Sequence, residues 1–218
     1  MKKLIDMSAW SRRDNFRFFQ DFANSWYSVT TEVECADAFN ICKESGSSFF
    51  IRYLYAVVRA ANEVEAFRYR KLEDGNIAVY DRLDIITPIA TSDNFVTIRI
   101  PYHKDFHKFT KSAKAIIESI SPETDPYAVE HEMEVSKEYN VIHLSAVPKM
   151  RFTGMTFTVN RLGDPCFYPL SVMGKASKRN DGSMYMPYSI YVDHAFIDGS
   201  HLTKFFEIME SVMNDTTL

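Results

Sequence analysis

The spacing of apolar residues predicts a long buried helix in the first third of the chain. In residues 47–64, SSFFIRYLYAVVRAANEV, apolar side chains recur three and four residues apart after two serines. This spacing lines one face of a helix, and a serine ahead of the first turn can cap its free amides. A shorter helix is predicted over residues 37–46, DAFNICKESG, because the closing glycine suits a left-handed C-cap.

Three later segments have the same helical spacing, and several shorter segments have the pattern of strands. The predicted helices are 104–120, 127–139 and 200–213. A hairpin is predicted where 67–72 and 77–83 flank an Asp-Gly turn. Strands that continue the same sheet are predicted, from their β-branched and aromatic residues, at 84–91, 94–100, 140–148, 151–159, 166–173 and 183–196.

Helices and strands do not alternate regularly in this order, which argues against a doubly wound parallel sheet. We expect an α/β two-layer sandwich, in which a mixed β-sheet has helices packed on one side. The chain has no repeats or linker-like stretches. Residues 1–218 are therefore expected to form a single domain.

The charge of the chain is weakly acidic, with 25 Lys and Arg against 29 Asp and Glu. This balance argues against nucleic acid or an anionic membrane as the main partner. No run approaches the roughly 18 apolar residues of a membrane span. The start of the sequence, MKKLIDMSAW, lacks the apolar stretch of a signal peptide. We therefore expect a cytoplasmic protein.

Residues 191–201, YVDHAFIDGSH, carry the strongest chemical signal. They join a predicted strand to the last predicted helix, a junction where catalytic groups are often held rigidly and open to substrate. His194 can act there as a general base, because a neutral imidazole accepts protons near pH 7. Asp198 can orient the ring or pair with an arginine. The spacing alone also fits a histidine with a purely structural role.

Residues 193–199, DHAFIDG, resemble the HxxxDG signature of the coenzyme-A-dependent acyltransferases. Their Asp-His start is similar to that of dihydrolipoamide acyltransferase cores, and His201 is similar to the final histidine of the chloramphenicol acetyltransferase signature. Residues 10–19, WSRRDNFRFF, resemble the opening of the second family, and residues 47–84 resemble its helix, hairpin and strand. On these motifs, the chain is identified as a member of the chloramphenicol acetyltransferase family.

The resemblance implies a reaction, a co-substrate and an assembly. His194 would take the proton from an acceptor hydroxyl, whose oxygen attacks the thioester of acetyl-CoA directly, without an acyl-enzyme. Asp198 would pair with Arg12 as a structural brace for the base. Lys175 would meet the coenzyme phosphates, and Ala176 stands where the family often has a tyrosine near the adenine. The resemblance also implies a homotrimer with active sites at the subunit interfaces, and no metal.

Several positions depart from the family pattern. Gly154 falls where the family has the serine whose hydroxyl stabilises the oxyanion, and Val172 falls where it has a threonine that helps to fix a water. Thr153, Thr156 or a bound water could supply the missing hydrogen bond. Phe19 replaces a tyrosine of the antibiotic pocket, which removes a phenol and keeps a stacking surface.

Asp193 replaces the first histidine of the signature, and Ser200 replaces an aromatic residue. The departures leave His194 and Asp198 in place. We therefore expect an acetyl-CoA-dependent O-acetyltransferase resembling chloramphenicol acetyltransferase. Two alternatives stay open: the same fold acting on a different acceptor alcohol, such as a sugar or a different antibiotic alcohol, or a catalytically impaired binding or regulatory homologue.

Other functional classes have weaker support. His103 and His107 have the i, i+4 spacing of zinc helices, but lysines and an aspartate surround them and a third ligand is missing. Ser200 and His201 lack the GxSxG elbow of a serine hydrolase. The cysteines show no CxxC spacing, so reduced thiols are expected at Cys35, Cys42 and Cys166.

Overall fold

The computed structural model describes residues 1–158 and 168–218, and these fold into helices and two β-sheets. The helices are α1 (Arg13–Gln20), α2 (Ala36–Ser45), α3 (Phe49–Glu63), α4 (Phe106–Glu118), α5 (Ala128–Ser136) and α6 (Gly199–Met213), with a short 3₁₀ helix, η1 (Glu65–Arg68), after α3.

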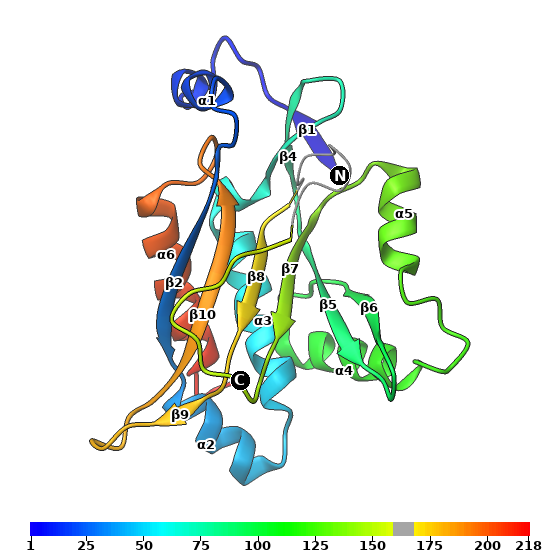
Figure 1. Ribbon diagram of the computed structural model, residues 1–218, viewed down its shortest axis with the longest axis vertical. Coiled ribbons are helices and arrows are strands. Elements are labelled where there is room, and N and C mark those ends of the chain that lie inside the picture. The colour runs from blue at the N-terminus through cyan, green and yellow to red at the C-terminus, as the bar shows by residue number, and fades with distance from the viewer. Residues whose placement is uncertain (159–167) are drawn as a thin grey trace.

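The larger sheet is mixed, with strands in the order β2, β10, β8, β7, β5, β6 (Figure 1). A short β9 pairs with the start of β10. Strands β5, β7 and β8 run parallel, and the other neighbours run antiparallel. The predicted mixed sheet is therefore confirmed. Its strands are β2 (Trp26–Glu34), β5 (Asp84–Ala90), β6 (Phe95–Ile100), β7 (Val141–Ala146), β8 (Leu170–Met173), β9 (Ser177–Lys178) and β10 (Met184–Asp193).

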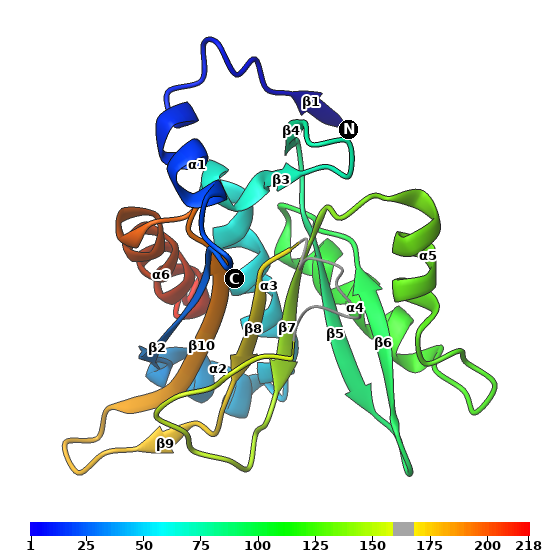
Figure 2. The same ribbon diagram turned by 45° about the horizontal axis from the view of Figure 1, so that its top comes forward.

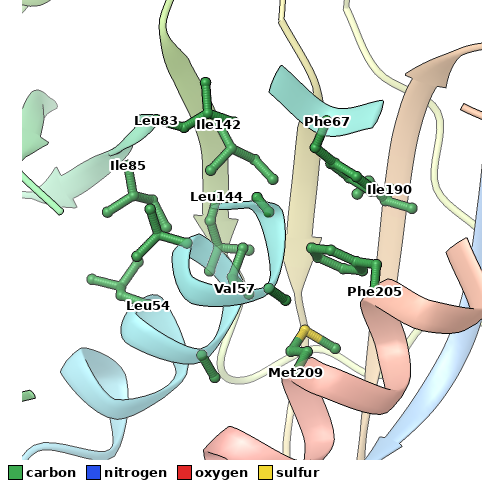
Figure 3. Close-up of a cluster of buried hydrophobic side chains, with 14 of the residues drawn as sticks. Leu54, Val57, Phe67, Leu83, Ile85, Ile142, Leu144, Ile190, Phe205 and Met209 are labelled. Atoms are coloured by element: carbon green, nitrogen blue, oxygen red, sulfur yellow. The ribbon is translucent and has the colours of Figure 1, made fainter. Parts of the chain in front are cut away.

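Helices α3 and α6 pack on each other and cover one face of this sheet (Figures 1 and 2). Figure 3 shows Leu54 and Val57 of α3 beside Phe205 and Met209 of α6, with the sheet behind them. All four side chains are fully buried, and the ring of Phe67 stacks on Phe205 with 4.6 Å between centroids. Each such side chain contributes about 1.5–3 kcal/mol on burial. The predicted two-layer sandwich with helices on one side is confirmed.

The alternation of side chains along β7 separates the two faces of the sheet. Ile142 is buried in the core under α3, whereas His143 and Ser145 point to the opposite face. Ser145 pairs with Val172 of β8, so the Val172 side chain lies on this opposite face as well. We call it the open face. Residues 147–158 run across it, and α5 packs on β6 at its edge (Figure 1).

The caps of the helices follow the sequence signals. Ser48 Oγ accepts a hydrogen bond from the Ile51 amide at 3.2 Å, and Asp105 accepts one from the Lys108 amide at 2.9 Å. Helix α2 ends at Gly46, which has φ 68°, a left-handed conformation that glycine adopts without strain. To within a few residues at their ends, the helices predicted at 37–46, 47–64, 104–120, 127–139 and 200–213 are confirmed.

The predicted hairpin is present, but it belongs to a second, smaller sheet. β3 (Tyr69–Lys71) and β4 (Ile77–Tyr80) pair antiparallel around Gly75, and β1 (Lys2–Leu4) adds to the other edge of β4. The expectation that the hairpin continues into the sheet of the later strands is wrong. The reason is that β1 occupies the free edge of β4, while β5 pairs with β7 and β6 in the larger sheet.

Residues 151–158 were predicted as part of a strand, and this is wrong for the residues described. The segment is extended but joins no ladder, because β8 and β10 beneath it already pair on both sides. It packs through side chains instead, with the Phe157 ring stacked 5.7 Å from that of Tyr191. The strand predicted over 166–173 starts at Leu170, and residues 159–167 lie outside the described part of the chain.

The cysteines that the structure describes, Cys35 and Cys42, are buried free thiols, as expected. Cys166 lies outside the described residues. Burial raises the pKa of the Cys35 thiol to about 12, which keeps it protonated and unreactive near pH 7. Among the described helices, none has the length and apolar character to cross a membrane.

The core under α3 generates a prediction about stability. We expect Leu54→Ala to lower the free energy of unfolding by about 2–5 kcal/mol, because Leu54 is 0 % exposed and its removal leaves a cavity. Urea denaturation followed by far-UV circular dichroism measures this change. Val135→Ala on the exposed side of α5 is the control and should change the value by less than about 0.5 kcal/mol. Equal effects of the two substitutions would contradict the assigned core.

Candidate active site

His194 lies in the tight turn that joins β10 to α6. The Asp193 carbonyl accepts hydrogen bonds from the Phe196 and Ile197 amides, and its side chain accepts one from the Ala195 amide at 2.9 Å. The His194 amide donates to the Ser25 carbonyl at 2.9 Å, which ties the turn to the loop before β2. The backbone that carries the imidazole is therefore held on both sides.

The His194 ring is held between two aromatic side chains. Its centroid lies 4.2 Å from that of Phe19, with the planes 14° apart, and 4.6 Å from that of Tyr27, with the planes 33° apart. Its Nδ1 atom is buried and makes no hydrogen bond in the described part of the chain. The orientation of the ring is thus set by stacking, and among the described residues no carboxylate hydrogen-bonds to Nδ1.

Asp198 holds the start of α6 and the segment before α1. Its carboxylate accepts hydrogen bonds from Ser200 and His201 at the helix N-terminus, and Arg12 Nη1 donates to it at 3.0 Å. Partial burial acts to raise the pKa of Asp198, but the hydrogen bonds from Ser200 and Arg12 outweigh it and hold the pKa well below its ordinary value. The carboxylate is therefore charged near pH 7.

Helix α1 reaches the turn through aromatic packing. The rings of Phe16 and Phe196 stack at 5.4 Å, and Trp10 lies 6.3 Å from Phe196. Arg12 sits between Trp10 and α1, and its Nε and Nη2 atoms are buried without a partner among the described residues. Among the described residues, the Arg12 guanidinium makes one side-chain hydrogen bond, which goes to Asp198. That bond connects α1 with α6.

Lys175, a position predicted to contact the coenzyme, lies far from His194 within the chain. It lines a cavity of about 410 Å³ near Pro187, together with Arg151, Lys178, Arg179 and Thr153, the last of which was predicted for the oxyanion region. Pro187 precedes Asp193 by six residues on β10, a separation of about 20 Å along a strand. Sequence reasoning missed these three further cations, although the run KASKR at 175–179 signals two of them.

The positions predicted for the oxyanion region are also apart from His194. A Cβ built on Gly154 would meet no atom within 4 Å, Thr156 is exposed, and Val172 is 4 % exposed between β7 and β10. Ala176 is half-buried next to Lys175. In the described part of the chain, no hydrogen bond or ring contact joins His194 to these positions.

A second cavity, of about 520 Å³, lies beside the end of α1. Its lining includes Phe19, Trp26, Lys71 and Asp193 but not His194. Asp193 is 9 % exposed; burial raises the pKa of its carboxyl, while a hydrogen bond from Ser25 opposes this shift. Asp193, which replaces the first histidine of the signature, therefore lines this cavity. Its carboxyl also accepts the hydrogen bond from the Ala195 amide that closes the turn.

The residues of the two alternative sites, the zinc pair His103 and His107 and the hydrolase pair Ser200 and His201, have other surroundings in the structure. His103 precedes α4, which begins at Phe106, so His103 and His107 do not share a helix face. Among the described residues, no group of three or more metal-ligating side chains is present. Ser200 Oγ donates to Asp198 at 2.6 Å, and His201 Nδ1 accepts from the Asp198 amide at 3.2 Å, which makes both residues parts of the helix cap.

Comparison with known proteins matches these features to one family. The model of the family "Chloramphenicol acetyltransferase" matches residues 2–210. The chloramphenicol acetyltransferase of Proteus mirabilis is 27 % identical over 92 % of this chain and 89 % of its own, and that of Staphylococcus aureus is 25 % identical over 95 % and 94 %.

Solved structures agree with this match. The structure of a chloramphenicol acetyltransferase is 43 % identical, with a TM-score of 0.92 over 98 % of this chain and 100 % of that chain. The dihydrolipoamide acetyltransferase of Azotobacter vinelandii shares the fold, with 15 % identity and a TM-score of 0.61 over 93 % and 86 %. The chain therefore belongs to the chloramphenicol acetyltransferase family, a family of acyltransferase enzymes.

Proposed function

We propose that the chain is an acetyl-CoA-dependent O-acetyltransferase with His194 as its general base. The imidazole takes the proton of an acceptor hydroxyl while the oxygen attacks the thioester carbonyl. The carbon–sulfur bond then breaks, the proton passes to the leaving sulfur, and the products are an ester and free coenzyme A. The observation that carries this proposal is the His194 ring, fixed by Phe19 and Tyr27 at the end of β10.

The ion pair of Arg12 and Asp198 is a brace for this base. Asp198 caps α6, and α6 begins five residues after His194, so a shift of this cap moves the turn that carries the ring. Arg12 joins the same carboxylate to α1, which carries Phe19. The pair thereby connects the base with one of its two stacking partners.

The basic cavity around Lys175 is the site we propose for the coenzyme phosphates. Cations from two segments line it, Arg151 from one and Lys175 and Lys178 from the other, and they suit a phosphorylated nucleotide. Arg179 is already paired with Glu32 and stacks on Tyr185 at 3.8 Å. Tyr185 and Phe152 add apolar surface to the same cavity.

The two groups of residues lie apart along β10, and we propose that two copies of the chain contribute to each site. We propose that residues 1–218 form one catalytic domain, that three copies assemble, and that His194 of one copy faces the open face of the next. Phe18 and Phe22 of the α1 region are 60 % and 51 % exposed beside Phe19, which suits burial against a second copy. A cytoplasmic location fits this enzyme.

A second candidate is a binding or regulatory homologue with impaired catalysis. Gly154 favours it, because the position offers no hydroxyl to the oxyanion and the space around it is open. A lost oxyanion donor lowers turnover by about 10²–10³-fold in other enzymes. The acceptor is proposed to be a small alcohol, with chloramphenicol as the first compound to test.

Replacement of the base tests the mechanism. His194→Ala is expected to lower kcat by about 10²–10⁴-fold, because the variant lacks the proposed general base. Release of coenzyme A thiol with chloramphenicol and other alcohols measures this. Sedimentation equilibrium is the control and should give the mass of a trimer for the wild type and the variant. Unchanged turnover in the variant would contradict the assignment of the base, and a monomeric wild type would contradict the shared site.

Replacement of Gly154 tests the missing oxyanion donor. Gly154→Ser is expected to raise kcat by up to about 10²-fold, because the new hydroxyl can stabilise the tetrahedral oxyanion and its Cβ meets no neighbouring atom. Gly154→Ala is the matched control, since it adds the Cβ without the hydroxyl. The same thiol-release assay measures both. An equal change in the two variants would show that the hydroxyl has no role.

The brace predicts a pH-dependent stability. The pKa of Asp198 is lower in the folded protein than its ordinary value of about 3.9. The contribution of Asp198 to the free energy of unfolding is therefore present above about pH 3.9 and is lost as the pH falls below about 3.9. Asp198→Asn is expected to lower stability by about 1 kcal/mol at pH 7, and by less as the pH approaches 3. Thermal denaturation from pH 7 to pH 3 measures the difference, with Asp14→Asn on exposed α1 as control. A difference that does not vary with pH would exclude the charged brace.

A further inference from the structure

Asp193, the residue before the proposed base, places a carboxyl group in the turn between β10 and α6. The residue is 9 % exposed and pairs with Trp26 where β10 ends. The Ala195 amide donates a hydrogen bond to its Oδ1 atom at 2.9 Å, and the Ser25 hydroxyl donates another to the same carboxyl group. A buried acidic side chain is therefore fixed next to His194 in the chain.

The contacts of this turn form a closed set around the His194 imidazole. Ser25 donates to Asp193 through its hydroxyl and accepts from the His194 amide through its carbonyl, at 2.9 Å. Two residues further on, Tyr27 stacks on the imidazole and donates to the Ile197 carbonyl at 3.3 Å. The loop that holds the carboxyl group thus also carries a stacking partner of the ring.

Closure of the turn does not by itself require a charge. Asparagine can accept a hydrogen bond from the amide two residues further on, as aspartate does, without the cost of a buried charge. Burial raises the pKa of Asp193, and the hydrogen bonds from Ser25 and the Ala195 amide oppose this shift. The positive charges of Lys71 and of a protonated His194 oppose it as well. The carboxylate therefore becomes favourable here when a cation lies near it.

His194 is the better placed of the two cations. Lys71 of β3 is exposed, so water and salt screen its charge. Asp198, the other carboxylate of the turn, is already paired with Arg12 at 3.0 Å. The hydrogen bonds to Asp193 come from neutral donors instead, which leaves its negative charge available to the neighbouring imidazole.

The transfer reaction, which is itself our proposed function, turns this imidazole into a cation. When His194 takes the proton of the acceptor hydroxyl, the ring becomes an imidazolium, and it is neutral again once the proton passes to the leaving sulfur. A fixed negative charge that is felt only while the positive charge develops lowers the barrier to reaction. The Asp193 carboxylate can act in this way through space, while Nδ1 of the ring has no partner among the described residues.

We infer that Asp193 is a positioning residue for the acyl transfer. Its contacts with Ser25 and Ala195 hold His194 in place, and its charge stabilises the imidazolium that forms there. The inference gives a role to a position at which this chain departs from the chloramphenicol acetyltransferase signature.

Two substitutions separate the charge of Asp193 from its contacts. Asp193→Asn removes the charge and keeps an oxygen for the Ala195 amide, whereas Asp193→Ala removes both. We expect Asp193→Asn to lower kcat about tenfold and to leave the KM values for acetyl-CoA and the alcohol unchanged, because the charge acts once the ring is protonated. Asp193→Ala should lower kcat further. Thiol release measures all of these values.

Asp215→Asn is the matched control. Asp215 also accepts a hydrogen bond from the amide two residues further on, that of Thr217, at 2.9 Å, but it follows the far end of α6. Its kcat should equal that of the wild type. The melting temperature of Asp193→Asn should not fall, because the substitution removes a buried charge. A purely structural role predicts wild-type kcat for Asp193→Asn and a loss in Asp193→Ala alone, and that result would overturn the inference.

The same substitution in the His194→Ala variant shows whether Asp193 acts through the base. The residual thiol release should then change by less than about twofold, because no imidazolium forms. An equal loss with and without His194 would overturn the inference and leave the base in place. Wild-type turnover in His194→Ala, or a wild type that acetylates no alcohol, would instead overturn the proposed function and the inference with it.

Discussion

The turn between β10 and α6 is the constraint on which the proposed chemistry depends. β10 pairs with β2 along its whole length and with β8 near its end, and α6 is held by its buried face in the core. Residues 194–198 must reverse the chain between these two fixed elements. The Asp193 side chain and carbonyl close the turn, and Asp198 caps the helix that follows. The packing of β10 in the sheet and of α6 in the core thus fixes the position of His194. Among the described residues, no carboxylate needs to hydrogen-bond to the ring to orient it.

The same rigid strand separates the two halves of the proposed site. A strand rises about 3.3 Å per residue and does not bend to bring its ends together, so the basic cavity near Pro187 stays away from the turn at Asp193. Direct acyl transfer needs the thioester, the hydroxyl and the imidazole within contact of one another. In the proposed assembly, a second copy against the open face brings these groups together without any movement of β10.

Sequence patterns predicted the parts of the molecule that depend on local spacing. The helical periodicity of α3 and α6 and the motif around His194 fall in this class. The pairing of Arg12 with Asp198 joins distant parts of the chain, and only the family resemblance implied it. Residues 151–158 have the composition of a strand, but pairing depends on free edges elsewhere in the sheet. Helix α1 was missed because it is short and has few apolar positions. Strand β2 was missed although its aromatic and β-branched residues are typical of a strand. The stacking of Phe19 and Tyr27 on His194 was beyond prediction, since such contacts between distant segments are a property of the whole fold.

The period of two along a strand allows one segment to serve stability and recognition at once. On β7, Ile142 and Leu144 fill the core under α3, and His143 and Ser145 between them face the open side. Both polar side chains are half-buried, and Ser145 lies beside Val172 on the face that carries the positions predicted for the oxyanion region. One strand thereby stabilises the core on one face and presents polar groups to the proposed site on the other.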